Sequence, residues 1–347
     1  MSATSMVIGR AIGPDQPPYV IAELSANHLG SLPRALAIVD AAADAGCDAI
    51  KLQTFEPGSM TLDDADPRFR IDEGPWAGRR LWELYDEAQT PWAWHAALFE
   101  RGRARGLAVF STPFDEVAVA RLDALGAPAF KIASFELVDL ELIAAAARTG
   151  KPLLMSTGMA SDAEVDEAVA VARRAGSGPI ALLHCVSGYP TPPEASNLRR
   201  LDALARHGLV GISDHSPGAI VAIAAVARGA CVIEKHLTLA RADGGPDAGF
   251  SLEPAEMAEV VRGARTAWAA LGDGTAARPA VEASSRALRR SLFAVEAIAA
   301  GEALTRTNVR ALRPGVGLPP RELDRVIGRR AAQPIARGTP LAWELLA

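Results

Sequence analysis

The stretch AFKIASFELVDLELIAAAARTGKPLLMSTG, residues 129–158, decides the fold. It begins with a short apolar run at 129–132, continues with apolar residues at helical spacing over 140–149, and ends with a second apolar run at 153–156. A strand, a helix and another strand in immediate succession are typical of a β-α-β unit, because two parallel strands need a crossover connection. The stretch therefore predicts two neighbouring strands of a parallel sheet.

The same unit recurs on both sides of this stretch. The predicted strands are 19–23, 49–53, 108–111, 129–132, 153–156, 180–185, 210–213 and 232–236. The predicted helices are 32–45, 92–105, 117–125, 140–149, 163–175, 198–207, 220–229 and 254–271. Eight β-α units in about 255 residues match a (β/α)8 TIM barrel. A doubly wound open sheet is the alternative, although it rarely contains eight units this regular. The connection 53–91 is long for such a fold and is predicted to be an active-site loop.

Composition excludes several classes of protein. The chain has 347 residues, of which 49% are hydrophobic and 22% charged, which is typical of globular proteins and not of disordered chains or coiled coils. Its longest apolar run, 219–227, is far shorter than the roughly 20 residues of a membrane span. The formal net charge of −5 argues against nucleic acid as the main partner.

Location is predicted from the first residues and the cysteines. The N-terminal MSATSMVIGR has no basic segment followed by an apolar one, so no signal peptide is expected. The three cysteines, Cys47, Cys185 and Cys231, have no CxxC spacing, which disfavours disulfides and structural zinc. We therefore expect a cytoplasmic protein.

The composition changes near residue 272, and this change predicts two domains. Residues 1–272 are expected to form the barrel. Residues 273–290 are polar and rich in small side chains, as in a linker. Residues 291–347 contain short β-like pieces at 291–295, 298, 309–312 and 332–335, so a small β-rich domain without a long helix is expected.

Polar residues cluster where the predicted strands end, which is the face that carries chemistry in such barrels. In chain order they are Glu23, Ser25, Asn27 and His28; Lys51, Gln53 and Thr54; Ser111, Thr112 and Asp115; Lys131 and Ser134; Ser156 and Thr157; His184, Ser187 and Tyr189; Ser213, Asp214 and His215; and Glu234, Lys235 and His236. Only four lysines occur in the chain, and three of them are in this set, the exception being Lys151. Ammonium groups beside hydroxyls predict a site for a small anion that carries phosphate, carboxylate or both.

Two histidines extend this prediction. His215 and His236 end neighbouring predicted strands, and Glu234 shares a face of its strand with His236. Two imidazoles in this position could share a divalent metal that keeps open positions for water or substrate. The alternative is that each histidine is an ordinary buried residue of the barrel.

Two other functions remain open at this point. A Schiff-base aldolase also places a lysine on a barrel strand, but its lysine needs apolar neighbours, whereas these lysines have hydroxyl, carboxylate and imidazole neighbours. A non-catalytic barrel that binds sugars or anions would need neither paired histidines nor the strand-end acids.

The motifs AELSANH (22–28), KLQT (51–54), STPFD (111–115), KIAS (131–134), STGM (156–159), YP (189–190), SDH (213–215) and EKH (234–236) occur in this order. This set resembles the sialic acid synthase family of phosphoenolpyruvate-dependent nonulosonate synthases. GE (301–302), RPG (313–315), GL (317–318) and GTPL (338–341) resemble the antifreeze-like SAF domain of the same family. AELSANH, KLQTFEP and KIASFE are most similar to the pseudaminate branch, since N-acetylneuraminate synthases more often read AEIG-x-NH.

The resemblance implies a reaction. Phosphoenolpyruvate would condense with the open-chain aldehyde of an N-acetylated six-carbon sugar and release phosphate. For the pseudaminate branch that sugar is 2,4-diacetamido-2,4,6-trideoxy-L-altrose, and the neuraminate and legionaminate branches use other N-acetylated hexoses. The resemblance also implies a cytoplasmic homodimer, with each SAF domain capping the active site of the partner subunit.

The resemblance further implies site residues. Phosphoenolpyruvate would contact Lys51, Thr112, Lys131, Ser134, Ser187, Ser213 and His215, although sialate synthases have Asn in place of Ser187. The sugar would contact Glu23, Tyr189, Glu234, Asp247 and Arg313. His215 and His236 would hold the metal, Mn²⁺ or alternatively Mg²⁺ or Co²⁺. Glu23, Glu234 and His236 are expected to be catalytic, the two carboxylates by stabilising positive charge that develops on the substrate.

Overall fold

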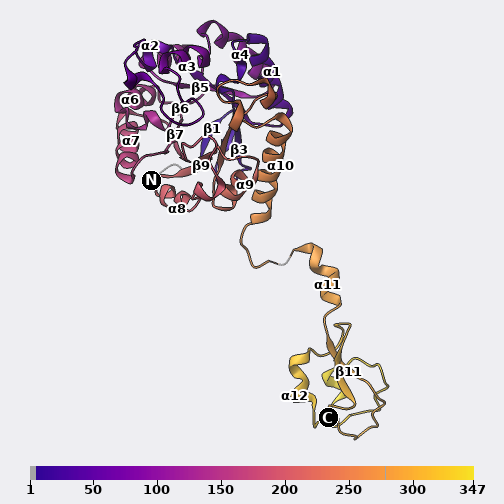
Figure 1. Ribbon diagram of the computed structural model, residues 1–347. Helices are drawn as coiled ribbons and strands as arrows, with labels where there is room; N and C mark the ends of the chain where they lie inside the picture. The colour runs from indigo at the N-terminus through magenta and orange to yellow at the C-terminus, as the bar shows by residue number, and fades with distance from the viewer. Residues whose placement is uncertain (1–4, 278) are drawn as a thin grey trace. The chain divides into compact units, whose positions relative to one another are not determined.

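The computed structural model describes residues 5–277 and 279–347 (Figure 1). Residues 1–4, part of the stretch in which no signal peptide is expected, and residue 278 of the predicted linker lie outside the described residues. The described chain divides after Gly272 into two compact units, which are treated separately below.

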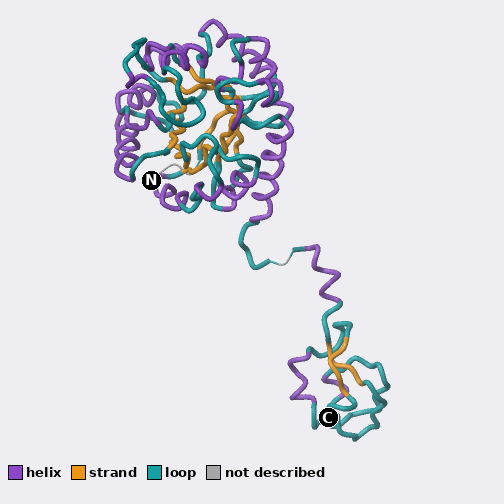
Figure 2. Tube along the Cα trace, in the orientation of Figure 1, coloured by secondary structure: helices purple, strands orange, loops and turns teal. Residues whose placement is uncertain are grey.

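The first unit is built around eight parallel strands, drawn in orange within its ring of helices in Figure 2. They are β3 (Tyr19–Glu23), β4 (Ala49–Thr54), β5 (Ala108–Pro113), β6 (Phe130–Ile132), β7 (Leu153–Ser156), β8 (Ile180–Cys185), β9 (Leu209–Ser213) and β10 (Val232–His236). The strands pair in chain order, and β10 pairs with β3 to close the sheet. The predicted TIM barrel is therefore confirmed, and the alternative of an open sheet is wrong.

Helices surround the barrel and begin where local sequence signals place them. They are α1 (Leu32–Asp44), α4 (Trp92–Ala104), α5 (Glu116–Ala124), α6 (Leu140–Arg148), α7 (Asp162–Ala175), α8 (Arg200–Leu204), α9 (Ile220–Ala227) and α10 (Pro254–Leu271). The start of α7 is set by Ser161 and Glu164, which cap each other's backbone groups, and its end by Gly176 at φ 96°. Helix α8 is shorter than predicted because residues 205–207 tighten into a 3₁₀ turn. None of the described helices is both long enough and apolar enough to cross a membrane.

Two features of this unit were not predicted. The connection 53–91, predicted to be an active-site loop, contains α2 (Pro57–Met60) and α3 (Leu81–Ala88). An antiparallel hairpin of β1 (Met6–Ile8) and β2 (Arg10–Ile12) precedes the barrel, and its apolar side chains pack onto the cluster inside the barrel. Its strands have three residues each, too few for a readable alternation of apolar and polar positions.

Alternation along the strands decides which side chains face the barrel interior. Tyr19 and Ile21 belong to the apolar cluster inside the barrel, whereas Val20 and Ala22 pack beneath the helices. Glu23 continues the inward-facing set because side chains in a strand alternate between faces. The same rule directs a set of polar residues inward at the C-terminal ends of the strands: Lys51, Thr112, Lys131, Ser156, Ser213, Glu234 and His236.

The C-terminal unit has a small core of its own. Strands β11 (Ser291–Ala294) and β12 (Val309–Leu312) pair antiparallel, and α11 (Ala283–Ala287) and α12 (Leu323–Val326) are single short helices. Leu292, Ile298, Ile335 and Leu341 are among its buried core residues. The predicted strand 332–335 does not form, since only an isolated bridge joins Ile298 and Ile335 there.

Candidate active site

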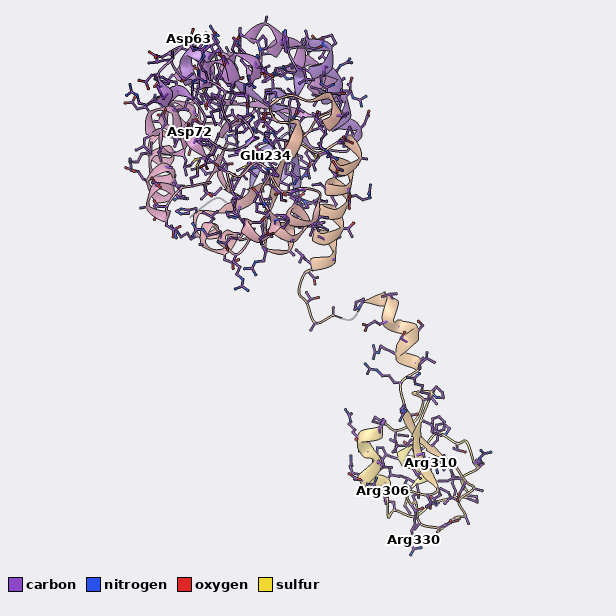
Figure 3. The ribbon with its side chains drawn as sticks, in the orientation of Figure 1. Asp63, Asp72, Glu234, Arg306, Arg310 and Arg330 are labelled. Carbon is purple, nitrogen blue, oxygen red and sulfur yellow. The ribbon has the colours of Figure 1, made fainter. Side chains whose placement is uncertain are left out.

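Four ionisable side chains meet inside the barrel at its C-terminal end. Glu23, Lys51, Lys131 and Glu234 are each less than 5% exposed, and Figure 3 labels Glu234 within the barrel. Lys51 forms an ion pair with Glu23, and its Nζ lies 3.9 Å from Glu234 Oε1. The Nζ of Lys131 lies 3.7 Å from the same oxygen. Two ammonium groups thus lie around one carboxylate.

Hydroxyl groups surround these lysines. Lys51 Nζ donates to Thr112 Oγ1 at 3.0 Å, and Lys131 Nζ donates to Ser156 Oγ at 2.7 Å. Ser213 Oγ donates to Glu234 Oε1 at 3.0 Å. Each ammonium has three donors, so both retain capacity for an anion that enters between them.

A glycine allows two further hydroxyls to converge beside this cluster. The backbone N–H of Gly158 donates to Ser134 Oγ at 3.1 Å. A Cβ atom at this glycine would lie 2.7 Å from that oxygen and 2.5 Å from Ser187 Oγ. Both distances are shorter than atoms tolerate, so any larger residue would push the hydroxyls apart. Ser134 and Ser187 therefore approach each other beside Gly158, and their contact with an anion stays a prediction.

The two carboxylates differ in their affinity for a proton. Burial raises the pKa of Glu23 to about 7, although Lys51 opposes the shift. Burial would also raise the pKa of Glu234, but Lys131 and Lys51 lower it below its ordinary value. Two acids with separated pKa values in one site are suited to different tasks, one exchanging a proton near neutral pH and the other remaining ionised.

The two lysines also differ. Burial lowers the pKa of Lys131, which the attraction of Glu234 only partly offsets. Burial acts in the same direction on Lys51, but the adjacent Glu23 and Glu234 raise its pKa above the ordinary value. Lys51 is therefore firmly charged.

His215 and His236 lie side by side, with ring centroids 5.3 Å apart. The Nδ1 of His215 is 3.1 Å from the carbonyl oxygen of Val186, so this nitrogen carries the proton and Nε2 keeps its lone pair free. The Nδ1 of His236 is buried without a hydrogen-bond partner, and burial lowers its pKa well below the ordinary value. A neutral, unpartnered imidazole such as that of His236 is the form that binds a divalent metal. Burial would lower the pKa of His215 too, but its contact with Cys185 raises it above the ordinary value. The arrangement of the two rings fits such an ion.

This metal site would have few protein ligands. Among residues 5–277 and 279–347, no group of three or more His, Cys, Asp or Glu side chains could hold a metal. Two imidazoles would therefore leave the remaining coordination positions to water or substrate, as a catalytic site requires.

An aromatic wall adjoins the histidines. The rings of Tyr189 and His215 are 4.4 Å apart, and Phe250 lies 5.0 Å from both Tyr189 and His236. Trp76, from the connection after β4, lies 5.4 Å from Tyr189, and its Nε1 donates to Pro246 O at 2.8 Å. Sequence reasoning missed Trp76 and Phe250, because neither follows a strand end directly.

A further acid near the site was also missed. Burial raises the pKa of Glu136 to about 7, and its Oε2 is buried without a hydrogen-bond partner. Its position two residues after Ser134 in the KIASFE motif was the available signal.

One strand-end lysine does not join the site. Lys235 faces the surrounding helices, forms an ion pair with Asp214 at 2.8 Å and donates to Ser216 O at 2.7 Å. Lys235 ends a strand but was not among the residues predicted to contact phosphoenolpyruvate, and it faces away because it has the opposite parity to Glu234 on β10. Its contacts brace the turn that presents His215 instead.

Arg313 belongs to the C-terminal unit, and its role stays a prediction.

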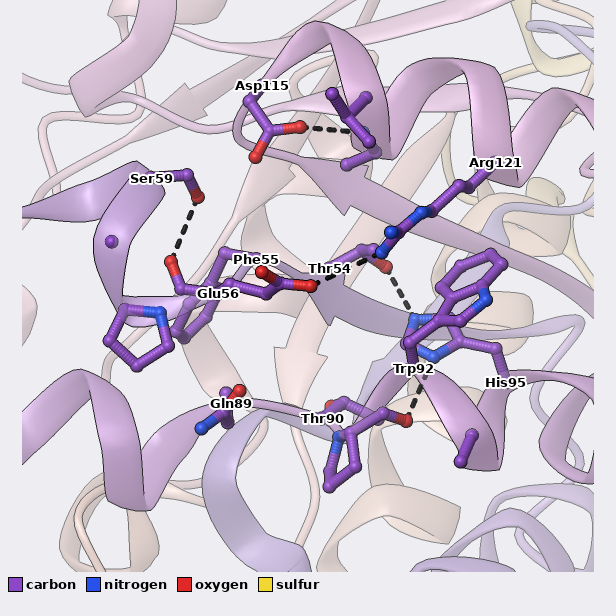
Figure 4. Close-up of a pocket in the computed structure, with 16 residues that line it drawn as sticks. Thr54, Phe55, Glu56, Ser59, Gln89, Thr90, Trp92, His95, Asp115 and Arg121 are labelled. Carbon is purple, nitrogen blue, oxygen red and sulfur yellow. Dashed lines mark hydrogen bonds and ion pairs between the residues drawn. The ribbon is translucent and has the colours of Figure 1, made fainter.

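A separate cavity of about 520 Å³ lies beside the barrel, lined by residues of the connection after β4 and of α4 and α5 (Figure 4). Thr54 and Asp115 of the strand-end set line it, but none of the residues predicted to contact phosphoenolpyruvate, sugar or metal does. At its edge His95 Nε2 lies 2.7 Å from Thr54 Oγ1, which in turn lies 2.6 Å from Ser111 Oγ. These residues therefore serve the barrel wall, not the anion site.

His95 makes stability depend on pH. Burial lowers its pKa to about 4 from an ordinary value of 6.5, so the unfolded chain takes up this proton at a higher pH than the folded chain. The free energy of unfolding should then fall as the pH drops from 6.5 to 4, by about 3 kcal/mol from this group. Urea titrations across this range would measure the effect. In His95→Gln, which can still hydrogen-bond Thr54, this part of the pH dependence should disappear, and an unchanged pH profile would contradict the assignment.

Comparison with known proteins places this geometry in context. The model of the NeuB family matches residues 38–276, and that of the SAF domain matches residues 289–347. The chain is 40% identical to the pseudaminic acid synthase of Helicobacter pylori, over 94% of this chain and 97% of that one. It is 34% identical to the N,N'-diacetyllegionaminic acid synthase of Legionella pneumophila, over 94% of each. A crystal structure of N-acetylneuraminic acid synthetase from Leptospira borgpetersenii in complex with citrate superposes with a TM-score of 0.74 at 33% identity, covering 82% of this chain and 95% of that one.

Proposed function

The chain belongs to the NeuB family, and from that premise we propose that it condenses phosphoenolpyruvate with 2,4-diacetamido-2,4,6-trideoxy-L-altrose to give pseudaminic acid and phosphate. The main support for this proposal is the pair Lys51 and Lys131. Both lysines are buried at the C-terminal end of a closed barrel, and each donates to a hydroxyl on a neighbouring strand. Identity of 40% to a pseudaminic acid synthase, against 34% to a legionaminic acid synthase, favours this sugar over the alternatives.

The anion site supports binding of phosphoenolpyruvate. Its phosphate and carboxylate would take the remaining donors of Lys51 and Lys131 and the hydroxyls of Thr112, Ser134, Ser187 and Ser213, with His215 at the edge. Charge-assisted hydrogen bonds of this kind are short and strong, and the buried site excludes competing water.

The chemistry needs no nucleophile from the protein. Carbon C3 of phosphoenolpyruvate attacks the sugar aldehyde, which forms the carbon–carbon bond and leaves positive charge at C2. Glu234 stays ionised between its lysines and stabilises that charge. Water then adds to C2 and gives up one proton, which replaces the proton that Glu23 donates as described below. The bond from C2 to the phosphate oxygen breaks, the C2 hydroxyl becomes the keto group, and its proton leaves with the phosphate.

Proton transfer falls to Glu23. Its raised pKa lets it carry a proton near neutral pH and give it to the oxygen that was the aldehyde. We assign the other sugar contacts to Tyr189, Asp247 and Arg313. A divalent metal held by His215 and His236, Mn²⁺ in our proposal and Mg²⁺ or Co²⁺ as alternatives, would polarise the aldehyde as a Lewis acid.

Charge supports a dimer in which the C-terminal unit caps the partner's barrel. Residues 273–347 contain 12 arginines and 7 acidic residues, including Arg306, Arg310 and Arg330 in Figure 3. Residues 1–272 contain 24 basic and 34 acidic residues, and the connection 53–91 alone has nine acids against four arginines. The predicted linker 273–290 contains two helical turns, η8 (Ala280–Glu282) and α11 (Ala283–Ala287), so about ten of its residues could extend, over roughly 35 Å, in addition to the length of these turns. We therefore propose a domain-swapped homodimer.

The function is tested by a panel of sugars. Purified protein is incubated with phosphoenolpyruvate, Mn²⁺ and either N-acetylmannosamine or one of the 2,4-diacetamido-2,4,6-trideoxyhexoses, and phosphate release is measured. We expect the highest kcat/KM with the L-altrose derivative. Preference for another sugar would move the chain to the neuraminate or legionaminate branch. Binding without phosphate release from any sugar would support a non-catalytic barrel instead.

Metal removal is expected to abolish turnover. Incubation with a chelator should stop phosphate release, because without a metal bound to His215 and His236 no Lewis acid polarises the aldehyde. Added Mn²⁺ should restore the release. His236→Ala should lose most activity, and added Mn²⁺ should restore little of it. Near-normal, metal-independent rates in His236→Ala would contradict the assignment.

A further inference from the structure

Lys235 is the strand-end lysine to which the proposed reaction gives no part. It lies between Glu234 and His236 on β10, but its side chain points to the opposite face of the strand. The residue is only 1% exposed. Only four of the 36 basic residues of this chain are lysines, so arginine is its ordinary choice of cation. A buried lysine here indicates a position that needs a compact ammonium group and not a planar guanidinium.

The two proposed metal ligands are held by the barrel in different ways. His236 belongs to the ladder between β10 and β3. The ladder between β9 and β10 ends at the pair Ser213 and Glu234, with one further backbone bond from Asp214 N–H to Glu234 O at 2.9 Å. His215 lies beyond that bond, on the turn that follows β9. Strand pairing therefore fixes His236, whereas other contacts must fix His215.

Lys235 connects this turn to β10. Its Nζ donates to Asp214 Oδ2 at 2.8 Å and to Ser216 O at 2.7 Å, so it holds both neighbours of His215 in the chain. The other carboxylate oxygen of Asp214, Oδ1, accepts from the N–H of Ser216 at 2.9 Å and closes the turn. Lys235, Asp214 and Ser216 are all buried. The turn that carries one histidine is thus tied to the residue that precedes the other.

The remaining contacts of His215 lead to a different part of the barrel. Its carbonyl oxygen accepts from the N–H of Thr191 at 3.1 Å, and its Nδ1 donates to Val186 O at 3.1 Å. Both partners lie in the connection after β8. These contacts orient the imidazole, but they do not relate it to β10. A metal shared by two histidines needs their separation to be fixed as well.

Stability alone is a poor reason for a buried ion pair. The cost of removing two charges from water offsets most of their attraction, and apolar residues of similar volume often stabilise an interior equally well. Groups that orient metal ligands, however, contribute to the affinity for the metal. We propose that Lys235 is a positioning residue, which sets the place of His215 relative to His236 and so raises the affinity of the site for a divalent metal. This inference rests on the proposed function.

The test measures Mn²⁺ binding to the purified full-length chain in the absence of substrates. In Lys235→Met we expect the dissociation constant of Mn²⁺ to rise about 10- to 100-fold, as for other groups that orient metal ligands. The electron paramagnetic resonance signal of the free ion measures this constant. The unfolding temperature of the metal-free chain should also fall, because Asp214 is left buried without its cation.

The double variant Lys235→Met/Asp214→Asn separates positioning from stability. It contains no unpaired buried charge, and the asparagine keeps an acceptor for the N–H of Ser216, so most of the lost unfolding temperature should return. The Mn²⁺ affinity should stay low, because nothing ties the turn to β10 in place of the lysine. If Lys235→Met does not fold, the double variant decides by itself.

Arg10→Met is the matched control. Arg10 likewise donates to a carboxylate, that of Asp48 at 2.7 and 2.9 Å, and to two backbone carbonyl oxygens, those of Pro17 and Pro18. Asp48 precedes β4, so this pair lies at the end of the barrel opposite to the histidines. The variant should lower the unfolding temperature without changing the dissociation constant of Mn²⁺.

Three results would overturn the inference, and they can be told apart. An unchanged dissociation constant of Mn²⁺ in both Lys235 variants means that His215 is held without this lysine. Recovery of Mn²⁺ affinity together with stability in the double variant means that the ion pair serves the fold alone. A wild-type chain that binds none of Mn²⁺, Mg²⁺ and Co²⁺ refutes the metal site of the proposed function, and with it the premise of the inference.

Discussion

Lys51→Ala and Lys131→Ala should each weaken phosphoenolpyruvate binding about 10- to 100-fold, far more than they weaken sugar binding. Each variant loses a charge-assisted contact of about 1.5–3 kcal/mol inside a buried site. Lys131→Ala also leaves Glu234 with Lys51 as its remaining ammonium neighbour, at 3.9 Å. Steady-state kinetics with one substrate varied at a time would measure the separate KM and kcat values.

Lys151 offers a matched control for these variants. It precedes β7 at the opposite end of the barrel and pairs with Asp123 at 2.6 Å, so Lys151→Ala removes an ammonium group without touching the site. Its kinetics should stay close to those of the wild type. Borohydride trapping of the pyruvyl or sugar group on Lys51 or Lys131 would contradict our assignment and support a Schiff-base aldolase.

Mixing two inactive variants is expected to restore activity if the C-terminal unit acts on its partner. In a swapped dimer, Lys131→Ala and Arg313→Ala chains together form one site with an intact lysine and an intact arginine. Random exchange yields mixed dimers in half of the molecules, so recovery could approach about a quarter of wild-type activity. Phosphate release after subunit exchange would measure this recovery.

The control mixes Lys131→Ala with Lys51→Ala. Both residues belong to the same barrel, so no mixed dimer contains an intact site and no recovery is expected. If Arg313→Ala and Lys131→Ala chains also fail to recover despite proven exchange, the arginine acts within its own chain or not at all. Truncation after residue 272 should leave a folded barrel with little condensation activity, because the barrel has its own core.

Much of the barrel could be predicted because its signals are local. Each strand is a short apolar run, and each helix has its own periodicity and caps, so most elements lie within one or two residues of the prediction. The hairpin β1–β2 and the short helices of the connection after β4 were missed because each spans only a few residues. In the C-terminal unit, side-chain packing and isolated bridges hold segments such as 332–335 that alternation alone had suggested as strands.

The sequence could predict a set of candidate residues, but only the structure shows which of them lie together in the candidate site. Judged by strand-end position alone, Lys131 and Lys235 were equal candidates for the site. In the structure Lys131 faces Glu234, whereas Lys235 faces the helices and pairs with Asp214. Trp76 and Glu136 lie in connections between strands and helices. In such connections, sequence position does not reveal where a side chain points.

By itself, the sequence determined the eight β-α units, the presence of lysines and hydroxyls at the strand ends and the family, because these depend on residue types and on spacing along the chain. Only the tertiary structure decided which side chains face each other. Strands buried on both faces are apolar throughout and show no alternation from which an inward face could be read. Closure of β10 onto β3 fixes which residues of each strand face inward. It also brings Glu23 beside His236, although more than 200 residues of chain separate them. The separation of the Glu23 and Glu234 pKa values follows from the same closure, since burial and neighbouring ammonium groups exist only once the barrel has formed.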